Sequence, residues 1–227
     1  KNSRLYPLEA SVEALTSRTT EEGEKVKISW RDGEETNLLL KMRGAAQGEN
    51  SALALLLLKT LNLYRPGVSE EAIMGASLPG RMEKLSSKPP LIIDGAHTEA
   101  SLRHLLTSFV QLYGNEGNTL IFGALEGKDH IHMAHLLLPL FENIIVSRPG
   151  TFKASNPEKL FALLQEEARR LKVKPNFYLA LEANDALELA LSLVAKGGAI
   201  LTTGSFYLCG DITLAFRERG KHESKLA

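Results

Sequence analysis

From residue 91 onward, short runs of apolar residues alternate with longer segments whose apolar residues recur at helical spacing. Leu91–Ile93, Thr119–Phe122 and Asn143–Ser147 have the length and composition of buried strands. Strands separated by helices pair in parallel, because each crossover helix returns the chain to the same edge of the sheet. We therefore predict an α/β fold whose mostly parallel sheet of five or six strands has helices on both faces.

The remaining elements predicted for this part of the chain follow the same alternation. Helices are predicted over residues 98–113, 128–140, 157–171, 184–196 and 208–219, and further strands over residues 176–181 and 199–203. Thr98 is suited to cap the first of these helices, and Asn156-Pro157 supplies a cap and a first-turn proline for the third. Residues 81–227 are therefore predicted to form one Rossmann-like domain.

The first 80 residues have a different organisation. Lys25–Trp30 and Thr36–Lys41 are strand-like runs joined by a turn that contains Asp32-Gly33, which predicts a β-hairpin. Residues 5–18 mix apolar and polar residues at roughly helical spacing. One hairpin and two or three helices are little for an independent domain, so we expect residues 1–80 to be an incomplete α/β segment.

The sequence predicts two helices in this first part, with a loop before the longer one. Ser51–Leu63 predicts a helix with apolar residues on all sides, and such a helix is normally buried on most of its surface. Gly44–Asn50, just before it, is polar and reads as a loop, and a short helix is predicted over residues 69–76.

Composition excludes several classes of protein. Lys plus Arg equals Asp plus Glu at 27 each among the 227 residues, so no overall field attracts nucleic acid or an anionic membrane. The longest apolar run, Ala52–Leu58, is far shorter than the ~20 residues of a membrane span. The single cysteine, Cys209, excludes an internal disulfide framework and favours a reducing, cytoplasmic location. Because the sequence begins without methionine or a signal-peptide core, we expect a part of a longer protein.

Candidate binding residues cluster where the first buried strand ends. Asp94, His97 and Thr98 follow Leu91–Ile93 directly, and ligands of open α/β sheets bind at the carboxyl ends of the strands. Arg81, just after a Pro-Gly turn, is placed to bring a positive charge to the same crevice. For His97, a nucleotide or substrate contact is weighed against a structural histidine.

A second candidate follows the strand that ends at Phe122. Gly123–Asp129 resembles a phosphate-binding loop, but its spacing is one residue short, and Asp129 stands where a serine or threonine would hold magnesium. We therefore reject a phosphate loop here. Lys128 remains as a carboxylate-binding lysine at a strand end, or as a solvated surface lysine.

Other residue types give weaker indications. His130, His132 and His135 lie close in sequence, but only the last two share a helical face and no cysteine supports them, so no metal site is predicted. Ser205 follows the strand over residues 199–203 and precedes a helix, whose free N–H groups suit a carboxylate. The alternative for Ser205 is an ordinary turn serine.

Four motifs in order carry a resemblance to a known family. They are Leu-Pro-Gly-Arg-Met-Glu at 78–83, Ile-Ile-Asp-Gly-Ala-His at 92–97, Phe-Gly-Ala-Leu-Glu-Gly-Lys-Asp at 122–129 and Thr-Gly-Ser-Phe-Tyr-Leu at 203–208. Together they resemble the carboxyl-terminal part of folylpolyglutamate synthase and dihydrofolate synthase, members of the Mur ligase superfamily. Residues 43–54 resemble the end of that family's central ATP-binding domain, where a Gly-x-His-Gln-x-x-Asn-Ala pattern opens a helix. The resemblance extends from about residue 40 to residue 217.

The resemblance implies an ATP-dependent ligase that activates a carboxylate as an acyl phosphate, which the amine of an incoming glutamate then attacks. Asn50, Arg81, Asp94 and His97 match positions that contact ATP. Three further residues match positions that bind the incoming amino acid in related ligases: Thr98, Lys128 and Ser205. The implied partners are the small molecules ATP, glutamate and folate, with no nucleic acid, membrane or obligate protein partner.

The sequence also departs from the family pattern. Ala46 replaces a usual histidine, Thr98 replaces the asparagine of the folate branch, and Glu99 replaces the proline that follows it. The phosphate loop and the Mg²⁺ ligands of the family do not occur in these 227 residues, nor do residues that match catalytic positions. We expect this chain to be a carboxyl-terminal fragment, inactive alone; the alternative is a non-catalytic Rossmann-like module that binds a nucleotide or an amino acid.

Overall fold

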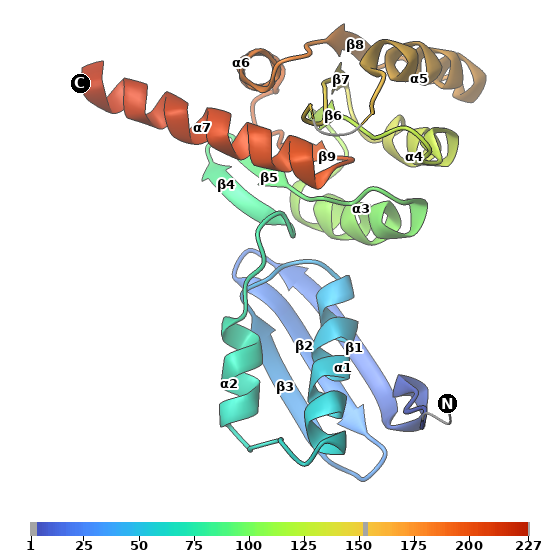
Figure 1. The fold of residues 1–227 in the computed structure, drawn as a ribbon, viewed down its shortest axis with the longest axis vertical. Helices are drawn as coiled ribbons and strands as arrows, with labels where there is room; N and C mark the ends of the chain where they lie inside the picture. Colours follow the sequence, from blue (N-terminus) through green and yellow to red (C-terminus); the bar gives the residue numbers. More distant parts are fainter. Residues whose placement is uncertain (1–3, 152–153, 227) are drawn as a thin grey trace. The chain divides into compact units, whose positions relative to one another are not determined.

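The computed structural model describes residues 4–151 and 154–226, and the chain divides into two compact units (Figure 1). Unit 1 comprises the residues up to Pro79 together with Thr107–Leu112. Unit 2 comprises Gly80–Leu106 and the residues from Tyr113 onward. Among the described residues, no helix combines the length and apolar character needed to cross a bilayer.

Unit 1 is built on a three-stranded antiparallel sheet in the order β1-β2-β3. Its elements are η1 (Leu8–Ala10), β1 (Val12–Thr20), β2 (Gly23–Trp30), β3 (Glu35–Leu40), α1 (Ala46–Thr60) and α2 (Val68–Gly75). Alternate residues of β2 and β3, including Val26, Ile28 and Leu38, are buried in one core with Leu55 of α1. The predicted hairpin is confirmed, because β2 and β3 pair along their length on either side of the Asp32-Gly33 turn.

The helical expectation for residues 5–18 is wrong for residues 12–18, which lie in β1, whereas Leu8–Ala10 forms the short 3₁₀ helix η1. Strand β1 pairs with β2 from Val12 opposite Trp30 to Thr20 opposite Gly23, so its backbone groups that face β2 are hydrogen-bonded. Its inward positions include Ser17, whose hydroxyl donates to Glu24 Oε1 at 2.5 Å. A polar residue on the buried face removes the apolar alternation by which a strand is recognised.

Helix α1 differs from its prediction in two ways. It begins at Ala46, inside the segment predicted as a loop, because its first turn is polar and apolar periodicity cannot detect it. It is also less buried than expected: Ala52, Leu55 and Leu56 are buried, whereas Leu53 and Leu57 are 48% and 58% exposed. Its apolar residues therefore occupy both a core face and a surface face.

Unit 2 contains, within the described residues, a six-stranded sheet in the order β4-β5-β9-β6-β7-β8. Its strands are β4 (Glu83–Ser87), β5 (Pro90–Ile93), β6 (Thr119–Phe122), β7 (Asn143–Val146), β8 (Asn176–Leu179) and β9 (Ile200–Thr203). Its helices are α3 (Glu99–Tyr113), α4 (His130–Leu137), α5 (Pro157–Leu171), α6 (Ala183–Leu193) and α7 (Phe206–Leu226). Strands β5 to β9 pair in parallel, and β4 alone is antiparallel to its neighbour. The predicted α/β fold with a mostly parallel sheet is confirmed.

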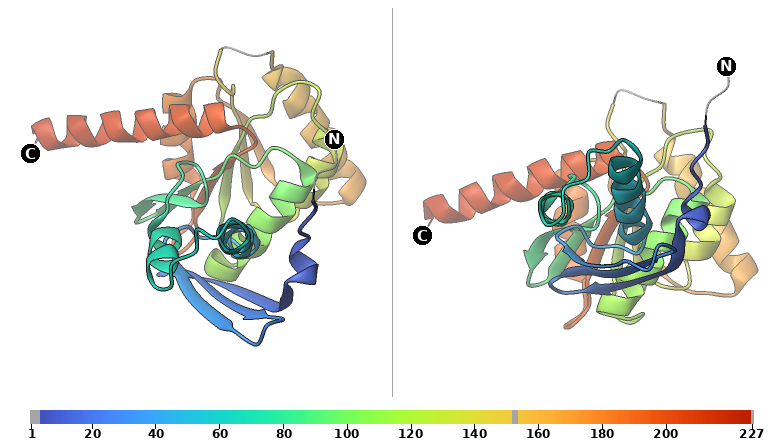
Figure 2. Two further views of the ribbon diagram at one scale, coloured as in Figure 1. Left: turned by 60° about the horizontal axis from the view of Figure 1, so that its bottom comes forward. Right: turned by 90° about the horizontal axis from the view of Figure 1, so that it is seen from below.

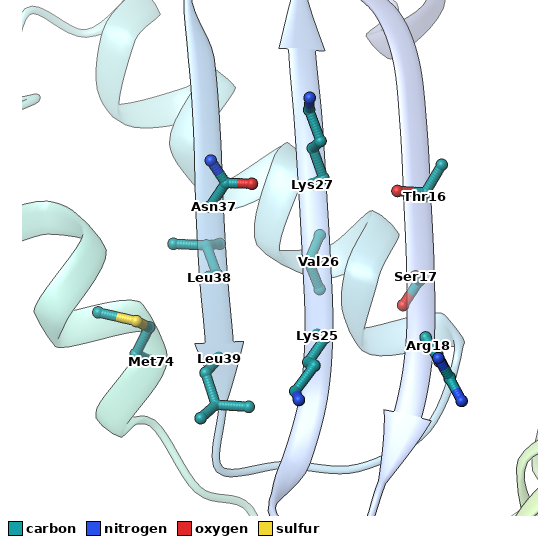
Figure 3. Close-up of a pocket in the computed structure, with 10 residues that line it drawn as sticks. All are labelled: Thr16, Ser17, Arg18, Lys25, Val26, Lys27, Asn37, Leu38, Leu39 and Met74. Carbon is teal, nitrogen blue, oxygen red and sulfur yellow. The ribbon is translucent and has the colours of Figure 1, made fainter.

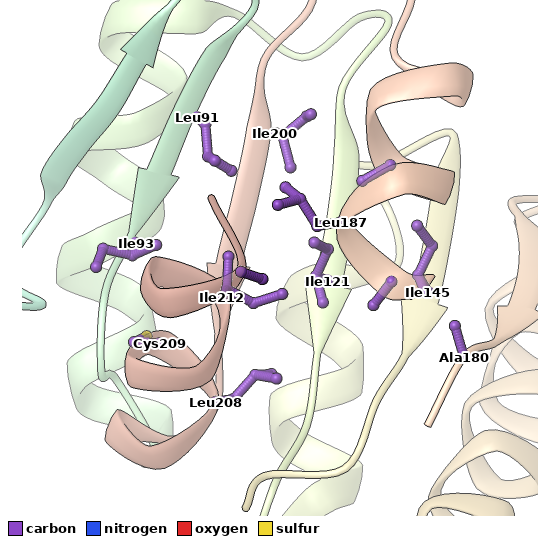
Figure 4. Close-up of a cluster of buried hydrophobic side chains, with 13 residues drawn as sticks. Leu91, Ile93, Ile121, Ile145, Ala180, Leu187, Ile200, Leu208, Cys209 and Ile212 are labelled. Atoms are coloured by element: carbon purple, nitrogen blue, oxygen red, sulfur yellow. The ribbon is translucent and has the colours of Figure 1, made fainter. Parts of the chain in front are cut away.

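Helices cover both faces of this sheet (Figure 1). On one face, α6 and α7 pack against the strands, and Leu187 and Ile212 meet Ile121, Ile145 and Ile200 in a continuous buried cluster (Figure 4). Helices α3, α4 and α5 lie on the other face. The views in Figure 2 show α7 as one continuous helix whose last turns extend beyond the sheet.

The strand order brings the predicted site segments to one edge. Strand β9 lies between β5 and β6, so the residues that follow these three central strands emerge at the same carboxyl edge. Gly204 shows how closely they approach: a Cβ atom there would lie 2.6 Å from the carbonyl oxygen of Gly123. The glycines after β9 and β6 therefore allow two strand ends to meet.

Candidate functional site

Asp94 braces the loop at the carboxyl end of β5. Its Oδ1 accepts the N–H of Ala96 at 2.8 Å, and its Oδ2 accepts the N–H of Met82 at 2.9 Å. A further bond, from the N–H of Gly95 to the carbonyl of Gly80 at 2.9 Å, joins the same two segments. The Pro-Gly-Arg-Met turn and the turn after β5 are therefore held together by one buried carboxylate.

Burial governs the protonation of this carboxylate. Asp94 is 7% exposed, and its removal from water raises the pKa of the carboxyl above its ordinary value. The two N–H donors and the nearby Arg81 charge oppose that shift by favouring the ionised form. Because backbone donors occupy both oxygens, the observed role of Asp94 is to shape the loop, and its contact with a nucleotide stays a prediction.

His97 is fixed by the same turn. Its Nδ1 lies 2.9 Å from the carbonyl oxygen of Gly95, and since a carbonyl only accepts, Nδ1 carries a proton and donates it. Within the described residues Nε2 has no hydrogen-bond partner, so the half-buried imidazole presents it as the second ring nitrogen.

Arg81 and His97 share a contact that the sequence did not reveal. The guanidinium carbon of Arg81 lies 4.8 Å from the ring centroid of Phe206, and the His97 ring lies 6.2 Å from the same ring at an interplanar angle of 62°. Phe206 follows Ser205 directly, but sequence reasoning took that motif only for its serine. The sequence feature that could have pointed to Phe206 is an aromatic residue immediately after Thr-Gly-Ser, at the end of a predicted strand.

Thr98 and Ser101 cap helix α3 reciprocally. The N–H of Ser101 donates to Thr98 Oγ1 at 3.2 Å, and the N–H of Thr98 donates to Ser101 Oγ at 3.1 Å. The prediction that Thr98 caps this helix is confirmed. Its side chain is exposed, so a role in binding an amino acid remains a separate prediction.

Ser205 lies inside unit 2 rather than on its surface. It is 3% exposed, and its Oγ accepts the N–H of Tyr207 at 3.2 Å at the start of α7. Just before it, the N–H of Gly204 and the hydroxyl of Thr203 both donate to the carbonyl of Ala96, at 2.9 and 3.2 Å. The end of β9 is therefore tied to the turn after β5.

Lys128 lies in a different hollow. It lines a pocket of about 470 Å³ at the N-terminal ends of α4 and α5, which are capped by Asp129 and Asn156. Lys128 is half-buried and has no ion-pair partner among the residues that the structure describes. Neither Thr98 nor Ser205 lines this pocket, so the pocket does not bring the three predicted glutamate contacts together.

The three histidines of this region already have partners. His130 Nε2 lies 3.0 Å from the carbonyl of Leu125, His132 Nδ1 lies 2.7 Å from Asp129 Oδ2, and His135 Nε2 lies 2.7 Å from Glu167 Oε2. Bonds from the backbone and ring of His132 hold the pKa of the Asp129 carboxyl below its usual value. These histidines thus tie α4 to the preceding loop, to its own N-cap and to α5.

Asn50 belongs to the other unit. It lies exposed on α1, and its amide donates to Gln47 Oε1 at 3.3 Å. Unit 1 also carries an open hollow of about 720 Å³ over its sheet, lined by Arg18 on β1, Lys25 and Lys27 on β2, Leu39 on β3 and Met74 on α2 (Figure 3). Asn50 does not line that hollow.

Comparison with known proteins confirms the resemblance carried by the four motifs. A family model described as Mur ligase, glutamate ligase domain, matches residues 80–206. Folylpolyglutamate synthase of Lacticaseibacillus casei is 30% identical over 199 residues, which cover 84% of this chain and 43% of that protein. Dihydrofolate synthase/folylpolyglutamate synthase of Bacillus subtilis (strain 168) is 26% identical over 174 residues, which cover 74% of this chain and 39% of that protein.

The fold is also similar to that of a solved structure. A solved structure of Mycobacterium tuberculosis folylpolyglutamate synthase complexed with ADP matches with a TM-score of 0.79 at 22% identity, covering 92% of this chain and 48% of the other. The chain thus spans less than half the length of these relatives. Since the family model covers more than half of its residues, this chain belongs to the Mur ligase family and contains the glutamate ligase domain.

Proposed function

We propose that this chain is the carboxyl-terminal part of an ATP-dependent ligase that adds glutamate to a folate, as in folylpolyglutamate synthase. The observation that carries the proposal is the loop braced by Asp94, which presents Arg81 and His97 at the carboxyl edge of β5 inside the matched domain. Similarity to folylpolyglutamate synthases over most of the chain supports the choice of glutamate and folate. Residues 1–80 would then be the end of the central ATP-binding domain.

The nucleotide contacts proposed for this chain are Arg81, His97, Asp94 and Asn50. Arg81 supplies a permanent positive charge, and the free Nε2 of His97 supplies a group that accepts or donates, so both suit a nucleoside phosphate. Asp94 acts chiefly by holding their loop. Among the described residues no group of three or more His, Cys, Asp or Glu side chains is arranged for a metal ion.

For glutamate, the proposed contacts are Lys128, Thr98 and Ser205. The half-buried ammonium of Lys128 lacks an ion pair among the described residues, which leaves it available for a carboxylate. Thr98 and Ser205 already accept N–H bonds at the starts of α3 and α7, and Thr98 Oγ1 also lies 2.9 Å from Ser101 Oγ, so a ligand at Thr98 shares its hydroxyl with the cap of α3.

The test compares the 227-residue chain with the longer protein encoded by its gene. With ATP, Mg²⁺, a folate and glutamate, the longer protein is expected to release ADP in a glutamate-dependent manner, and the chain alone is not. Glutamate-dependent ADP release by the chain alone would contradict the fragment assignment. A longer protein that shows no such activity, while the chain binds nucleotide, would favour a non-catalytic binding module.

The assignment of Lys128 is tested with a matched lysine. In the longer protein, Lys128→Ala is expected to raise the KM for glutamate about ten- to a hundredfold, because one hydrogen bond to a charged group is worth ~1.5–3 kcal/mol. Lys159 lines the same pocket but is exposed, so Lys159→Ala is expected to leave this KM within about twofold. If Lys128→Ala left the KM for glutamate unchanged, Lys128 would not bind glutamate and would be a solvated surface lysine.

A further inference from the structure

Phe206 occupies an unusual position for an aromatic residue at a helix start. It is the first residue of α7, and its side chain is 40% exposed at the carboxyl edge of the sheet. Yet the ring is in contact with two of the proposed nucleotide ligands, Arg81 at 4.8 Å and His97 at 6.2 Å. Both distances lie within the range of favourable cation–π and edge-to-face interactions.

Two glycines form a notch that receives the ring. A Cβ atom at Gly95 would lie 2.3–2.5 Å from three atoms of the Phe206 ring, and one at Gly80 would lie 3.3 Å from it. The backbone bond from Gly95 N–H to Gly80 O holds the two sides of the notch together. Arg81 and His97 extend from the same two segments, so the ring rests on the backbone that carries both side chains.

The backbone of Phe206 is itself anchored. The preceding residue, Ser205, is buried just before α7, and the N–H of Cys209 donates to its carbonyl at 3.1 Å. Leu208 and Cys209 then enter the core of unit 2 (Figure 4). A fixed backbone on one side and a glycine notch on the other leave the ring little freedom.

We infer that Phe206 is a positioning residue: its ring holds the Arg81 guanidinium and the His97 imidazole where a nucleoside phosphate would meet them. Arg81 forms no ion pair among the described residues, so without the ring its long side chain would be ordered only upon binding. If the side chain is ordered before the ligand binds, the entropy cost of ordering it no longer weakens the binding free energy. The nature of the ligand rests on the proposed function, whereas the ordering of Arg81 does not.

The test uses three substitutions in the full chain. Phe206→Ala is expected to increase the mobility of the Arg81 side chain, measured by NMR relaxation at its Nε–H, and to weaken ATP binding about three- to tenfold by calorimetry. Phe206→Tyr keeps a ring and is expected to rescue both properties. Phe206→Leu keeps apolar bulk without a ring, and both properties are expected to resemble those of Phe206→Ala. Leu214→Ala, at a 58% exposed position of the same helix, is the control and is expected to change neither.

A double-mutant cycle identifies the route of the effect. Gly95→Ala forces the ring out of the notch, so Gly95→Ala alone is expected to weaken ATP binding as Phe206→Ala does, and the double variant to be no weaker. Additive effects, or an Arg81 side chain equally ordered in Phe206→Ala and the wild type, would overturn the inference. If Phe206→Ala mobilises Arg81 but the wild type binds no nucleotide, the positioning role stands and the proposed function fails.

Discussion

Replacing Asp94 by alanine is expected to destabilise unit 2 more than any exposed aspartate would. The substitution removes the acceptor for two N–H groups, those of Met82 and Ala96, whose residues are 3% and 1% exposed. Water cannot readily replace the carboxylate at such buried positions. Each buried donor left without a partner costs about 1–3 kcal/mol, which gives a gross loss of about 2–6 kcal/mol.

Part of this loss is returned, because the variant no longer buries a carboxylate. The sign follows from the pKa, which burial raises above the ordinary value of 3.8. In the pH range above 3.8 the folded state holds the proton more tightly than the unfolded state, so the contribution of Asp94 is complete at lower pH and declines as pH rises through the folded pKa. We therefore expect a net loss of about 2–4 kcal/mol that is smaller at pH 7 than near pH 4.

Hydrogen exchange measures this loss within unit 2. The slowest amides of β5 and β9 report the free energy of unfolding, and the amides of Met82 and Ala96 report the loop itself. Asp185→Ala is the matched control, since Asp185 is exposed in the first turn of α6 and its loss is expected to cost less than about 1 kcal/mol. If Asp94→Ala lowered the free energy of unfolding by less than about 0.5 kcal/mol, or if its effect grew with pH, the proposed role of Asp94 in holding the loop would be refuted.

Two further predictions concern the sheet edge and the core. Gly204 has φ +101°, and an added Cβ would lie 2.6 Å from the Gly123 carbonyl oxygen, so Gly204→Ala is expected to cost more than about 3 kcal/mol in urea unfolding. Gly197→Ala, with φ +89° and open space, is expected to cost only about 1–2 kcal/mol, and equal costs would contradict the close approach. Burial raises the pKa of the Cys209 thiol to about 12, so at pH 8 a thiol reagent is expected to label Cys209 only after unfolding. Rapid labelling of the native chain would show that Cys209 is accessible.

The sequence predicted those parts of the fold whose cores are apolar. The short runs of β5, β6, β7 and β9 are buried on both faces, so their composition alone marks them as strands. By contrast, β1 places the half-buried Ser17 against the fully buried Glu24, and a polar pair of this kind leaves no apolar alternation to detect. Edge strand β4 is half-buried and polar, so its sequence pattern predicts no strand there for the same reason.

The candidate site was predictable in position but not in construction. Asp94 and His97 follow a buried strand, and the rule that ligands bind at carboxyl ends of parallel strands was sufficient to select them. Both oxygens of Asp94 accept backbone N–H groups, and one of these donors is Met82. Met82 lies next to Asp94 because the antiparallel pairing of β4 with β5 brings the turn before β4 to the end of β5. Contacts of this kind arise from tertiary pairing, so local pattern cannot reveal them.

Phe206 shows how the strand order couples this site to the core. The segment that follows β9 lies beside the turn after β5 only because β9, the last strand, inserts between β5 and β6. The carbonyl of Ala96 then accepts from both Thr203 and Gly204, and the ring of Phe206 enters the notch at Gly95. One helix, α7, thus supplies a site residue in its first turn and core residues in the next. The arrangement of Arg81 and His97 therefore depends on the same packing that stabilises unit 2. A substitution that disturbs this packing is expected to change both the stability of unit 2 and the arrangement of the two side chains.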